Sequence, residues 1–466
     1  MKIRVQVIVE SGDGTGEIVQ EIAQFERGQL RPDGLGLTMT EAKRLLEGLQ
    51  RIVVEQQIAG NAKEQAECPL CGNRRLHKGA HAIVYRTLFG KLELSSPRLF
   101  HCQCQPQRTR TFSPLAELLT ERTSPELLYL ETKFASLVSY GMSLKLFEEV
   151  LPIGAEINAA TIRNHTLAMA ERLESELGDE QWSFIEGCER DWEELPRPEM
   201  PLTVGIDGGY VDSCEQKGKK DGRFEVIVGK SMTAQGESKC FGLVNSYDTK
   251  PKRRVFEVLK SQGMRMNQQI TFLSDGGDTV RELQLYLNPQ AEHLLDWFHV
   301  SMRLTVMNQM AKGLGPEESE PRAGALKRLE SIKWFLWHGN VFKALQRIED
   351  LDMELEDETV TSESAEKLRK MLREFQIYIE NNQRWIPNYG ELWRAGDRIS
   401  TAFVESAVGQ VLSKRFVKKQ QMSWSRRGAH LLLQVRTREL NEELRDKFDE
   451  WYPGLGGNSE ECARAA

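Results

Sequence analysis

The chain has 466 residues and a mass of 53.2 kDa, a length typical of about three domains. Apolar residues make up 40% of it and charged residues 28%, which excludes a wholly disordered or collagen-like chain. No apolar run approaches the roughly 18–20 residues that span a bilayer, and residues 1–5 lack the pattern of a signal peptide. We therefore expect a soluble, cytoplasmic protein with no membrane partner.

The net charge of −7 conceals a strong segregation of charge along the chain. Residues 174–199 hold ten acidic and two basic side chains, and residues 349–366 hold nine acidic and no basic ones. Residues 68–110 carry eight Lys/Arg and one acid, and residues 414–438 carry eight and none. Because a polyanion responds to the local field of a patch, the two basic runs favour nucleic acid as a partner, although exposed charged faces would explain them too.

Residues 1–66 are predicted to hold one strand and a helical region. Residues 3–9 alternate between apolar and polar side chains, as a half-buried strand does. A Gly-rich turn follows, and residues 40–62 place apolar side chains on one helical stripe.

Four of the eight cysteines form two closely spaced pairs that predict a zinc ribbon over residues 67–111. These are Cys68, Cys71, Cys102 and Cys104. The residues between the pairs read as a hairpin, and two such pairs converge on one tetrahedral structural Zn²⁺. A redox dithiol and four buried thiols are the alternatives, and His77 or His101 could replace one thiolate.

Residues 112–180 read as helical, with helix-turn-helix spacing near their end. A short helix over 144–151 is followed by a turn and a longer helix that begins near 159. The second helix would present side chains that read base edges and phosphates: Thr161, Arg163, Asn164 and His165. The alternative is a helical pair that serves only packing.

An acidic linker over residues 181–200 leads into a region with alternating strand and helix signals. Strands are expected at 202–206, 224–228, 241–244, 270–273 and 293–295, with a helix at 252–262 between the third and fourth. Residues 300–378 have helical period, and a last helix begins near 401. This order predicts an RNase H-like core (201–299, completed by 396–440) interrupted by an all-helical insertion (300–395), with a tail at 441–466. The predicted fold class is therefore multidomain α/β.

Three carboxylates stand where metal-dependent phosphodiester chemistry requires them in that topology. Asp207 and Asp275 end the first and fourth predicted strands and each precedes two glycines, while Glu405 lies in the last helix. Carboxylate oxygens are ligands that Mg²⁺ prefers, and two such ions would activate the attacking oxygen and stabilise the leaving one. The alternative for each Asp is a turn. The competing acids are Asp212, Asp278, Asp397 and Glu391.

Between the second and third acids lies Asp296-Trp297-Phe298-His299. His299 is predicted either to lie beside the metal and the scissile phosphate or to be a core histidine. The aromatic residues Trp334, Phe335 and Trp337 are expected in the core of the insertion.

The basic run after Glu405 interleaves cations with amides and one aromatic side chain, as a DNA-binding track does. Its residues are Lys414, Arg415, Lys418, Lys419, Trp424, Arg426 and Arg427. Trp424 would stack on a base. An exposed helix and loop is the alternative.

These motifs together resemble the DDE transposases of bacterial insertion sequences, and most closely the ISKra-type family of the Mutator-like branch. The matching segments are Gly205–Gly209, Leu273–Gly276, Asp296–His299, Phe403–Ser406 and the tail from Ser413 to Arg436. The resemblance covers residues 200–440 well, the cysteine region moderately and the first 60 residues poorly.

The resemblance implies an enzyme that cleaves double-stranded DNA at element ends and joins the freed 3′-hydroxyl to target DNA. It implies Asp207, Asp275 and Glu405 as the catalytic and Mg²⁺ (or Mn²⁺) binding triad, with His299 as an active-site accessory. It also implies a homodimer or larger assembly on DNA, associated with the bacterial nucleoid. The alternatives are a host RNase H-like nuclease and a DNA-binding regulator whose RNase H-like domain is inactive.

Overall fold

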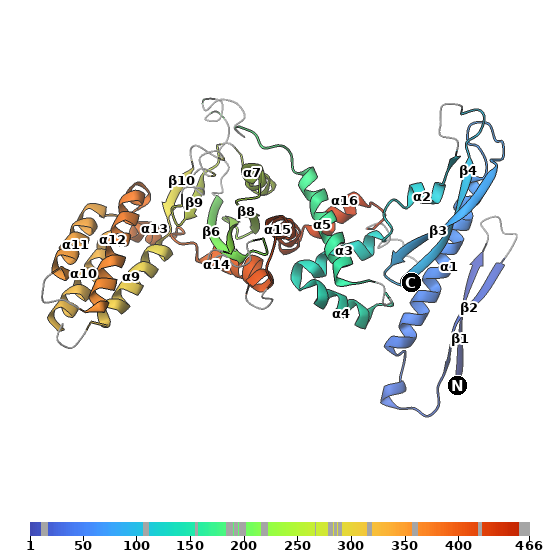
Figure 1. Ribbon diagram of the computed structural model, residues 1–466, viewed down its shortest axis with the longest axis horizontal. Coiled ribbons are helices and arrows are strands. Elements are labelled where there is room, and N and C mark those ends of the chain that lie inside the picture. Colours follow the sequence, from blue (N-terminus) through green and yellow to red (C-terminus); the bar gives the residue numbers. More distant parts are fainter. Residues whose placement is uncertain are drawn as a thin grey trace. The chain divides into compact units, whose positions relative to one another are not determined.

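The computed structural model describes residues 1–10, 17–105, 111–153, 157–182, 190, 194, 202–215, 222–265, 267–277, 283, 287, 291–314, 319–356, 362–417 and 422–455. The chain divides into two compact units, one of Met1–Met169 with Glu443–Ala466 and one of Ala170–Glu442. Each combines helices with β-sheet (Figure 1), so the multidomain α/β prediction is confirmed at that level. None of the helices described is both long and apolar enough to cross a membrane.

The first unit begins with an antiparallel hairpin and a long helix, where the sequence predicts a single strand before the helix. Strands β1 (Lys2–Glu10) and β2 (Glu17–Glu26) pair with each other, and after a 3₁₀ turn (Pro32–Gly34) α1 runs over Met39–Gln65. A capping box starts α1: the Thr38 hydroxyl accepts the N–H of Glu41, and the Glu41 carboxylate accepts the N–H of Thr38. This exchange satisfies two backbone donors that a helix start otherwise leaves unpaired.

A second sheet supports the cysteine region. Strands β3 (His77–Thr87), β4 (Gly90–Phe100) and β5 (Thr111–Phe112) are antiparallel in that order. The hairpin predicted between the cysteine pairs is therefore present. Its strands extend beyond the apolar residues that predicted it. Its buried face joins Leu115 of α2 in one apolar cluster.

Further helices belong wholly or in part to the first unit. They are α2 (Pro114–Leu118), α3 (Pro125–Leu137), α4 (Tyr140–Val150), the first part of α5 (Ala159–Glu176) and α16 (Leu444–Trp451). Tyr129 of α3 meets Phe448 of α16 edge to face at 5.3 Å between ring centroids. The C-terminal helix is thus part of the core of the first unit.

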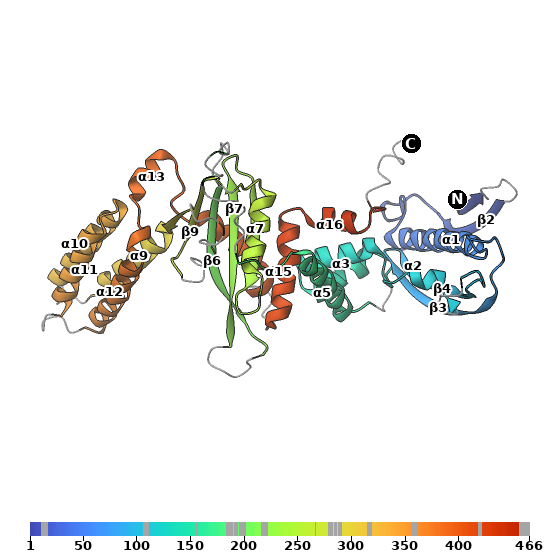
Figure 2. The ribbon, with the colours of Figure 1, turned by 90° about the horizontal axis from the view of Figure 1, so that it is seen from above.

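The second unit is built on one mixed five-stranded sheet. Its strands are β6 (Leu202–Asp212), β7 (Arg223–Thr233), β8 (Ser238–Val244), β9 (Ile270–Ser274) and β10 (Glu292–Leu295). Their order across the sheet is β10-β9-β6-β7-β8; β6, β9 and β10 are parallel, whereas β7 is antiparallel to β6 and β8. Strand β6 is longer than predicted because it pairs with its neighbour β7 along its whole length (Figure 2), so Asp207 lies within it rather than at its end.

Helices cover both faces of this sheet. Val204 and Ile206 share an apolar core with Val255 and Leu259 of α7 (Pro251–Ser261). Helix α14 (Ala402–Val408), the π-helical turn η4 (Gly409–Val417) and α15 (Arg426–Leu440) pack on the opposite face, where Gly242 meets Leu433. The described residues near the predicted linker 181–200 are few, and the predicted domain boundaries stay predictions.

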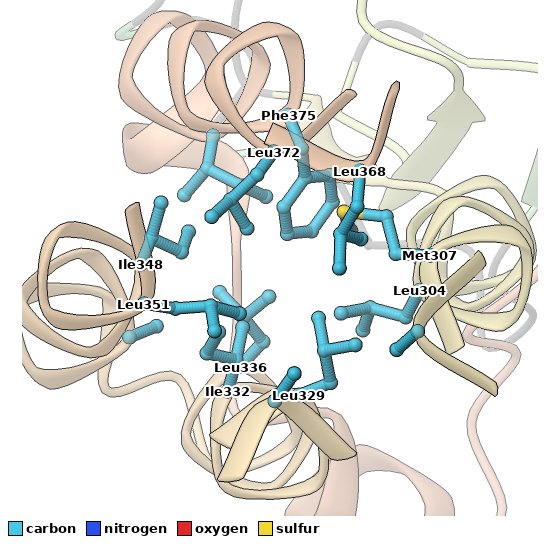
Figure 3. Packing of buried hydrophobic residues seen from close by; sticks show 14 of the residues in the cluster. Leu304, Met307, Leu329, Ile332, Leu336, Ile348, Leu351, Leu368, Leu372 and Phe375 are labelled. Carbon is cyan, nitrogen blue, oxygen red and sulfur yellow. The ribbon is translucent and has the colours of Figure 1, made fainter. Parts of the chain in front are cut away.

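The predicted helical insertion is a bundle of four helices around one apolar core. They are α9 (Trp297–Lys312), α10 (Ser319–Trp337), α11 (Val341–Leu355) and α12 (Glu363–Asn382), followed by η3 (Gln383–Trp385) and α13 (Tyr389–Ala395). Figure 3 shows Leu304, Leu336, Leu351 and Phe375 converging from the four helices. Phe335 and Trp337 pack on this core as expected, but Trp334 is 53% exposed and is not part of it.

Candidate active site and metal centres

Two glycines of β6 let the covering helix approach the strand on either side of Asp207. Gly205, Asp207 and Gly209 lie on one face because side chains alternate along a strand. A Cβ atom at Gly205 would overlap Val404 of α14, and one at Gly209 would overlap Leu412 of η4. The sequence Gly-Ile-Asp-Gly-Gly therefore serves close helix packing around a carboxylate.

Asp207 is a half-buried carboxylate in a negatively charged setting. Its side chain is 18% exposed, its Oδ1 accepts the N–H of Gly208 at 2.7 Å, and Oδ1 lies 3.9 Å from Nε2 of His299. Burial raises the pKa of Asp207, and the charges of Asp275 and Asp296 raise it further, against the opposing effects of Gly208 and His299. A nearby cation would relieve this charge repulsion.

Asp275 follows the strand parallel to β6. Gly205 pairs with Leu273 in the ladder, so Asp207 and Asp275 each lie two residues beyond that pair in the same direction. The exposed Asp275 carboxylate accepts the N–H of Gly277 at 3.1 Å, and Gly276 adopts φ +86°, a conformation that suits glycine. The sheet thus places the two predicted aspartates on adjacent strands.

Asp296, which the sequence marks only as part of a motif, is a buried junction between two helices. It is fully buried, caps α9 by accepting the N–H of Phe298 at 2.8 Å, and accepts the N–H of Thr401 at 3.1 Å. The Thr401 hydroxyl also bonds to its carboxylate. Because Thr401 is the N-cap of α14, Asp296 joins the start of the His299 helix to the start of the Glu405 helix. Nothing in the sequence pattern points to Thr401.

His299 lies between the two buried carboxylates. Its Nε2 is 3.9 Å from Asp207 and 3.7 Å from Oδ2 of Asp296, and the side chain is 32% exposed. The imidazole is partly open and lies near two acids, which favours the active-site prediction over the core-histidine alternative.

Glu405 lies next to this group but is not gathered into it. It is exposed on α14, one residue after Val404, which touches β6. Among the described residues, the oxygens of Asp207, Asp275 and Glu405 do not all lie within 4.8 Å of one another. Of the competing acids, Asp212 is paired with Arg223 at 2.9 Å, and Asp278 lies outside the described residues.

The residues present fit Mg²⁺ in part. Asp207 and Asp275 offer carboxylate oxygens, the donors that Mg²⁺ takes, and the raised pKa of Asp207 reflects an excess of negative charge. Glu405 would have to turn from solvent toward these two acids to complete a three-carboxylate set.

The four predicted zinc ligands form one cluster. Sγ of Cys68 lies 3.5 Å from that of Cys104, Sγ of Cys71 lies 3.4 Å from that of Cys102, and all four lie within 4.8 Å of one another. Tetrahedral Zn²⁺ with bonds of about 2.3 Å separates its sulfurs by about 3.8 Å, so the cluster fits one ion. Neither His77 nor His101 belongs to it.

The thiols of this cluster differ in pKa because each contacts different hydrogen-bond partners. Hydrogen bonding, chiefly from the N–H of Leu70, lowers the pKa of Cys68 to about 6. Contact with the sulfurs of Cys102 and then Cys68 raises the pKa of Cys104 to about 12. A cation that binds thiolates would remove this competition.

Another group with ligand-type atoms in proximity is organised around an arginine. Glu174, Asp248 and His430 lie within 4.8 Å of one another. The guanidinium of Arg254, 7% exposed, donates to Glu174 at 2.7 Å, to Asp248 at 2.8 Å and to Gln434 at 2.6 Å. A metal would have to displace this guanidinium, so we interpret the group as a structural ion-pair network.

In the predicted helix-turn-helix region, two of the predicted DNA-reading side chains lie at the surface. Arg163 and Asn164 are exposed near the start of α5. His165 instead bonds through Nδ1 to Oε2 of the fully buried Glu131 of α3 at 2.5 Å. His165 therefore joins two helices of the first unit. Its side chain faces Glu131 and is not presented to DNA as predicted.

Two residues of the predicted basic track are buried, which contradicts their assignment as DNA contacts. Trp424 is 5% exposed and its ring lies 4.8 Å from that of Phe416. Its backbone N–H donates to Asp212 and its carbonyl accepts from Cys214, which fixes it against the end of β6. Arg415 is fully buried, with its guanidinium 5.1 Å from the Trp424 ring. Trp424 is thus a core residue and does not stack on a base.

The other basic side chains of this run differ in their surroundings. Lys414 is exposed, Arg426 forms an ion pair with Glu215 at 2.6 Å, and Arg427 pairs with Glu171. Lys418 and Lys419 lie outside the described residues.

No family model matches the chain, and no curated protein matches it. Among solved structures, the chain is similar to the Drosophila P element transposase strand transfer complex, with 12% identity over 70% of this chain and 80% of that chain. The TM-score is 0.22, too low for this likeness to carry an argument about fold or function.

Proposed function

We propose that this protein is a metal-dependent DNA transposase that cuts at the ends of a mobile element and joins them to target DNA. The observation that carries the proposal is the position of Asp207 and Asp275 on adjacent parallel strands, with His299 3.9 Å from Asp207.

The sheet supports the assignment of an RNase H-like core. Three antiparallel strands (β6, β7, β8) are followed by two strands parallel to the first, in the order β10-β9-β6-β7-β8. The helical bundle between β10 and α14 stands where the predicted insertion interrupts such a core. The sequence motifs and this topology agree with each other.

Each residue would have a defined task in this reaction. Asp207 and Asp275 would hold Mg²⁺ or Mn²⁺, and Glu405 would complete the set when its side chain turns from solvent toward them. The ions would activate the attacking oxygen and stabilise the leaving one. His299, held near Asp207, would orient the scissile phosphate. In the first unit, the zinc-stabilised hairpin and the exposed Arg163 and Asn164 would recognise element ends.

The test uses a labelled duplex that carries the terminal sequence flanking this gene, incubated with Mg²⁺, Mn²⁺ or EDTA. We expect metal-dependent nicking by the wild type, at least 100-fold slower in Asp207→Asn and Glu405→Gln. Glu391→Gln, an exposed acid on the neighbouring helix α13, is the matched control and should cut normally. Joined products would distinguish a transposase from a nuclease.

A second function is favoured by one observation: Glu405 is exposed, and among the described residues its oxygens are not gathered with those of both aspartates. A DNA-binding regulator with an inactive core would bind the same duplex and give no product with any metal, in the wild type and the variants alike. That outcome would refute the catalytic assignment.

A further inference from the structure

The helical bundle carries an arginine on the same helix as His299. Arg303 is on α9, four residues after His299, so both side chains lie on one face of that helix. Its guanidinium carbon is 4.2 Å from the centroid of the Tyr378 ring of α12. The Arg303 side chain is exposed, and the contact with the ring fixes its direction.

Arg303 differs in its partners from four other arginines of the bundle. Arg328, Arg347, Arg369 and Arg373 each form an ion pair with an acid of α11 or the residue after it. Within the described part of the chain Arg303 has no carboxylate partner. Its charge is therefore available to an anion from outside the protein.

Helix α12 holds this arginine beside the candidate active site. Asn382, one turn after Tyr378 and 4% exposed, is so close to Gly276 that a Cβ atom there would overlap its Oδ1. Burial raises the pKa of Tyr378, the charge of Arg303 opposes this, and the charges of Asp275 and Asp296 add to it. The bundle face that carries Arg303 and Tyr378 thus adjoins the turn after Asp275.

We infer that Arg303, held on the Tyr378 ring, binds a DNA phosphate next to the scissile bond at the Asp207–Asp275 edge. A cluster of carboxylates repels DNA, and a guanidinium recognises phosphate oxygens through paired N–H donors. This inference rests on the proposed function and adds to it: the insertion, as well as the sheet, contributes to the active site.

The first test measures binding without cleavage, so it does not depend on catalysis. Affinity for the end duplex is measured in EDTA over a range of salt concentrations for the wild type, Arg303→Ala and Arg347→Ala. Loss of one phosphate contact should reduce the slope of log affinity against log salt by about one in Arg303→Ala alone. Arg347, an exposed arginine paired with Asp350, is the control. An unchanged slope for Arg303→Ala would overturn the inference.

The second test locates the phosphate by neutralising phosphates one at a time with methylphosphonate. We expect one position next to the cut to slow wild-type cleavage about as much as Arg303→Ala does, by about 100-fold. Arg303→Ala combined with that methylphosphonate should slow cleavage no further. Tyr378→Phe, which keeps the ring, should retain activity, whereas Tyr378→Leu should lose it. Multiplicative losses at every position would refute the contact.

The two tests separate this inference from the proposed function. A wild type that cuts nothing, together with a reduced salt slope in Arg303→Ala, would refute the transposase and retain Arg303 as a DNA contact. Normal cutting by the wild type, with no effect of Arg303→Ala on binding or cutting, would support the transposase and refute Arg303 as a DNA contact. Because Arg303 is exposed, its variant should melt at the wild-type temperature.

Discussion

Four carboxylates that are wholly or partly buried in the second unit have opposite electrostatic settings. Glu174 and Asp248 share the guanidinium of Arg254, whereas Asp207 and Asp296 have a single partly exposed histidine between them. Charges without a full partner destabilise a fold and are characteristic of functional sites. This contrast leads to two predictions of opposite sign.

Replacement of Asp207 by Asn should stabilise the fold and abolish cleavage. Burial raises the pKa of Asp207, so ionisation costs stability as pH rises above the unfolded value of about 3.9. We expect a gain of about 1 kcal/mol at pH 7 that vanishes below about pH 3.9. Thermal melts across this pH range measure it, with Mg²⁺ raising the melting temperature of the wild type only. A lower melting temperature for the variant at pH 7 would contradict this.

Replacement of Glu174 by Gln should destabilise the fold by about 1–2 kcal/mol at pH 7. The pKa of Glu174 is lowered to about 2: bonds from His430 and Arg254 outweigh burial, which opposes them. Its contribution is therefore complete above about pH 4.5 and is lost as pH falls toward 2. Denaturant unfolding at pH 7 and pH 3 measures the change, and the exposed Glu171→Gln serves as control. An equal loss at both pH values would argue against the ion pair.

At the scale of elements, glycine determines how closely α14 approaches β6. Gly205 has no side chain where Val404 packs, whereas Gly208, on the opposite face of the strand, has its nearest neighbour at 3.6 Å from a Cβ position. The two glycines are three residues apart and differ only in what covers them.

Gly205→Ala should therefore displace α14 and cost about 1–3 kcal/mol, while Gly208→Ala should cost less than about 0.5 kcal/mol. Because α14 carries Glu405, we also expect slower cleavage in Gly205→Ala alone. Urea unfolding and the end-cleavage assay check the pair. Equal stability of the two variants would show that the helix does not pack on the strand in this way.

The whole molecule places its two kinds of metal chemistry in different units. The four cysteines lie in the first unit, and the acidic edge lies in the second. Each unit has its own core, so we expect the two activities to be lost separately.

Cys71→Ser should remove zinc, measured as one ion per chain in the wild type, and weaken binding to element ends at least 10-fold. The melting transition of the second unit and the Mg²⁺ response of Asp207 should remain. Cys214→Ser, an exposed cysteine of the second unit, is the matched control and should keep both zinc and binding. If Cys71→Ser holds no zinc and still binds element ends fully, the zinc ribbon has no role in DNA recognition.

The sequence by itself determined features that depend on local pattern. Alternation predicted strands in both units, though not β2, helical period predicted the helices of the insertion, and paired spacing predicted the cysteine cluster, because each pattern records which side chains face a core or a common ion. Asp207 and Asp275 were found in the same way, since each follows a buried strand segment and precedes glycine.

Only the tertiary structure decided what depends on contacts between distant segments. Trp424 looked like a stacking residue within a basic run, but pairing with the end of β6 buries it. His165 faces Glu131 rather than solvent, and Asp296 meets Thr401 105 residues away. Composition and spacing describe the side chain and its neighbours in sequence, whereas burial and partnership are set by elements that fold against it from elsewhere in the chain.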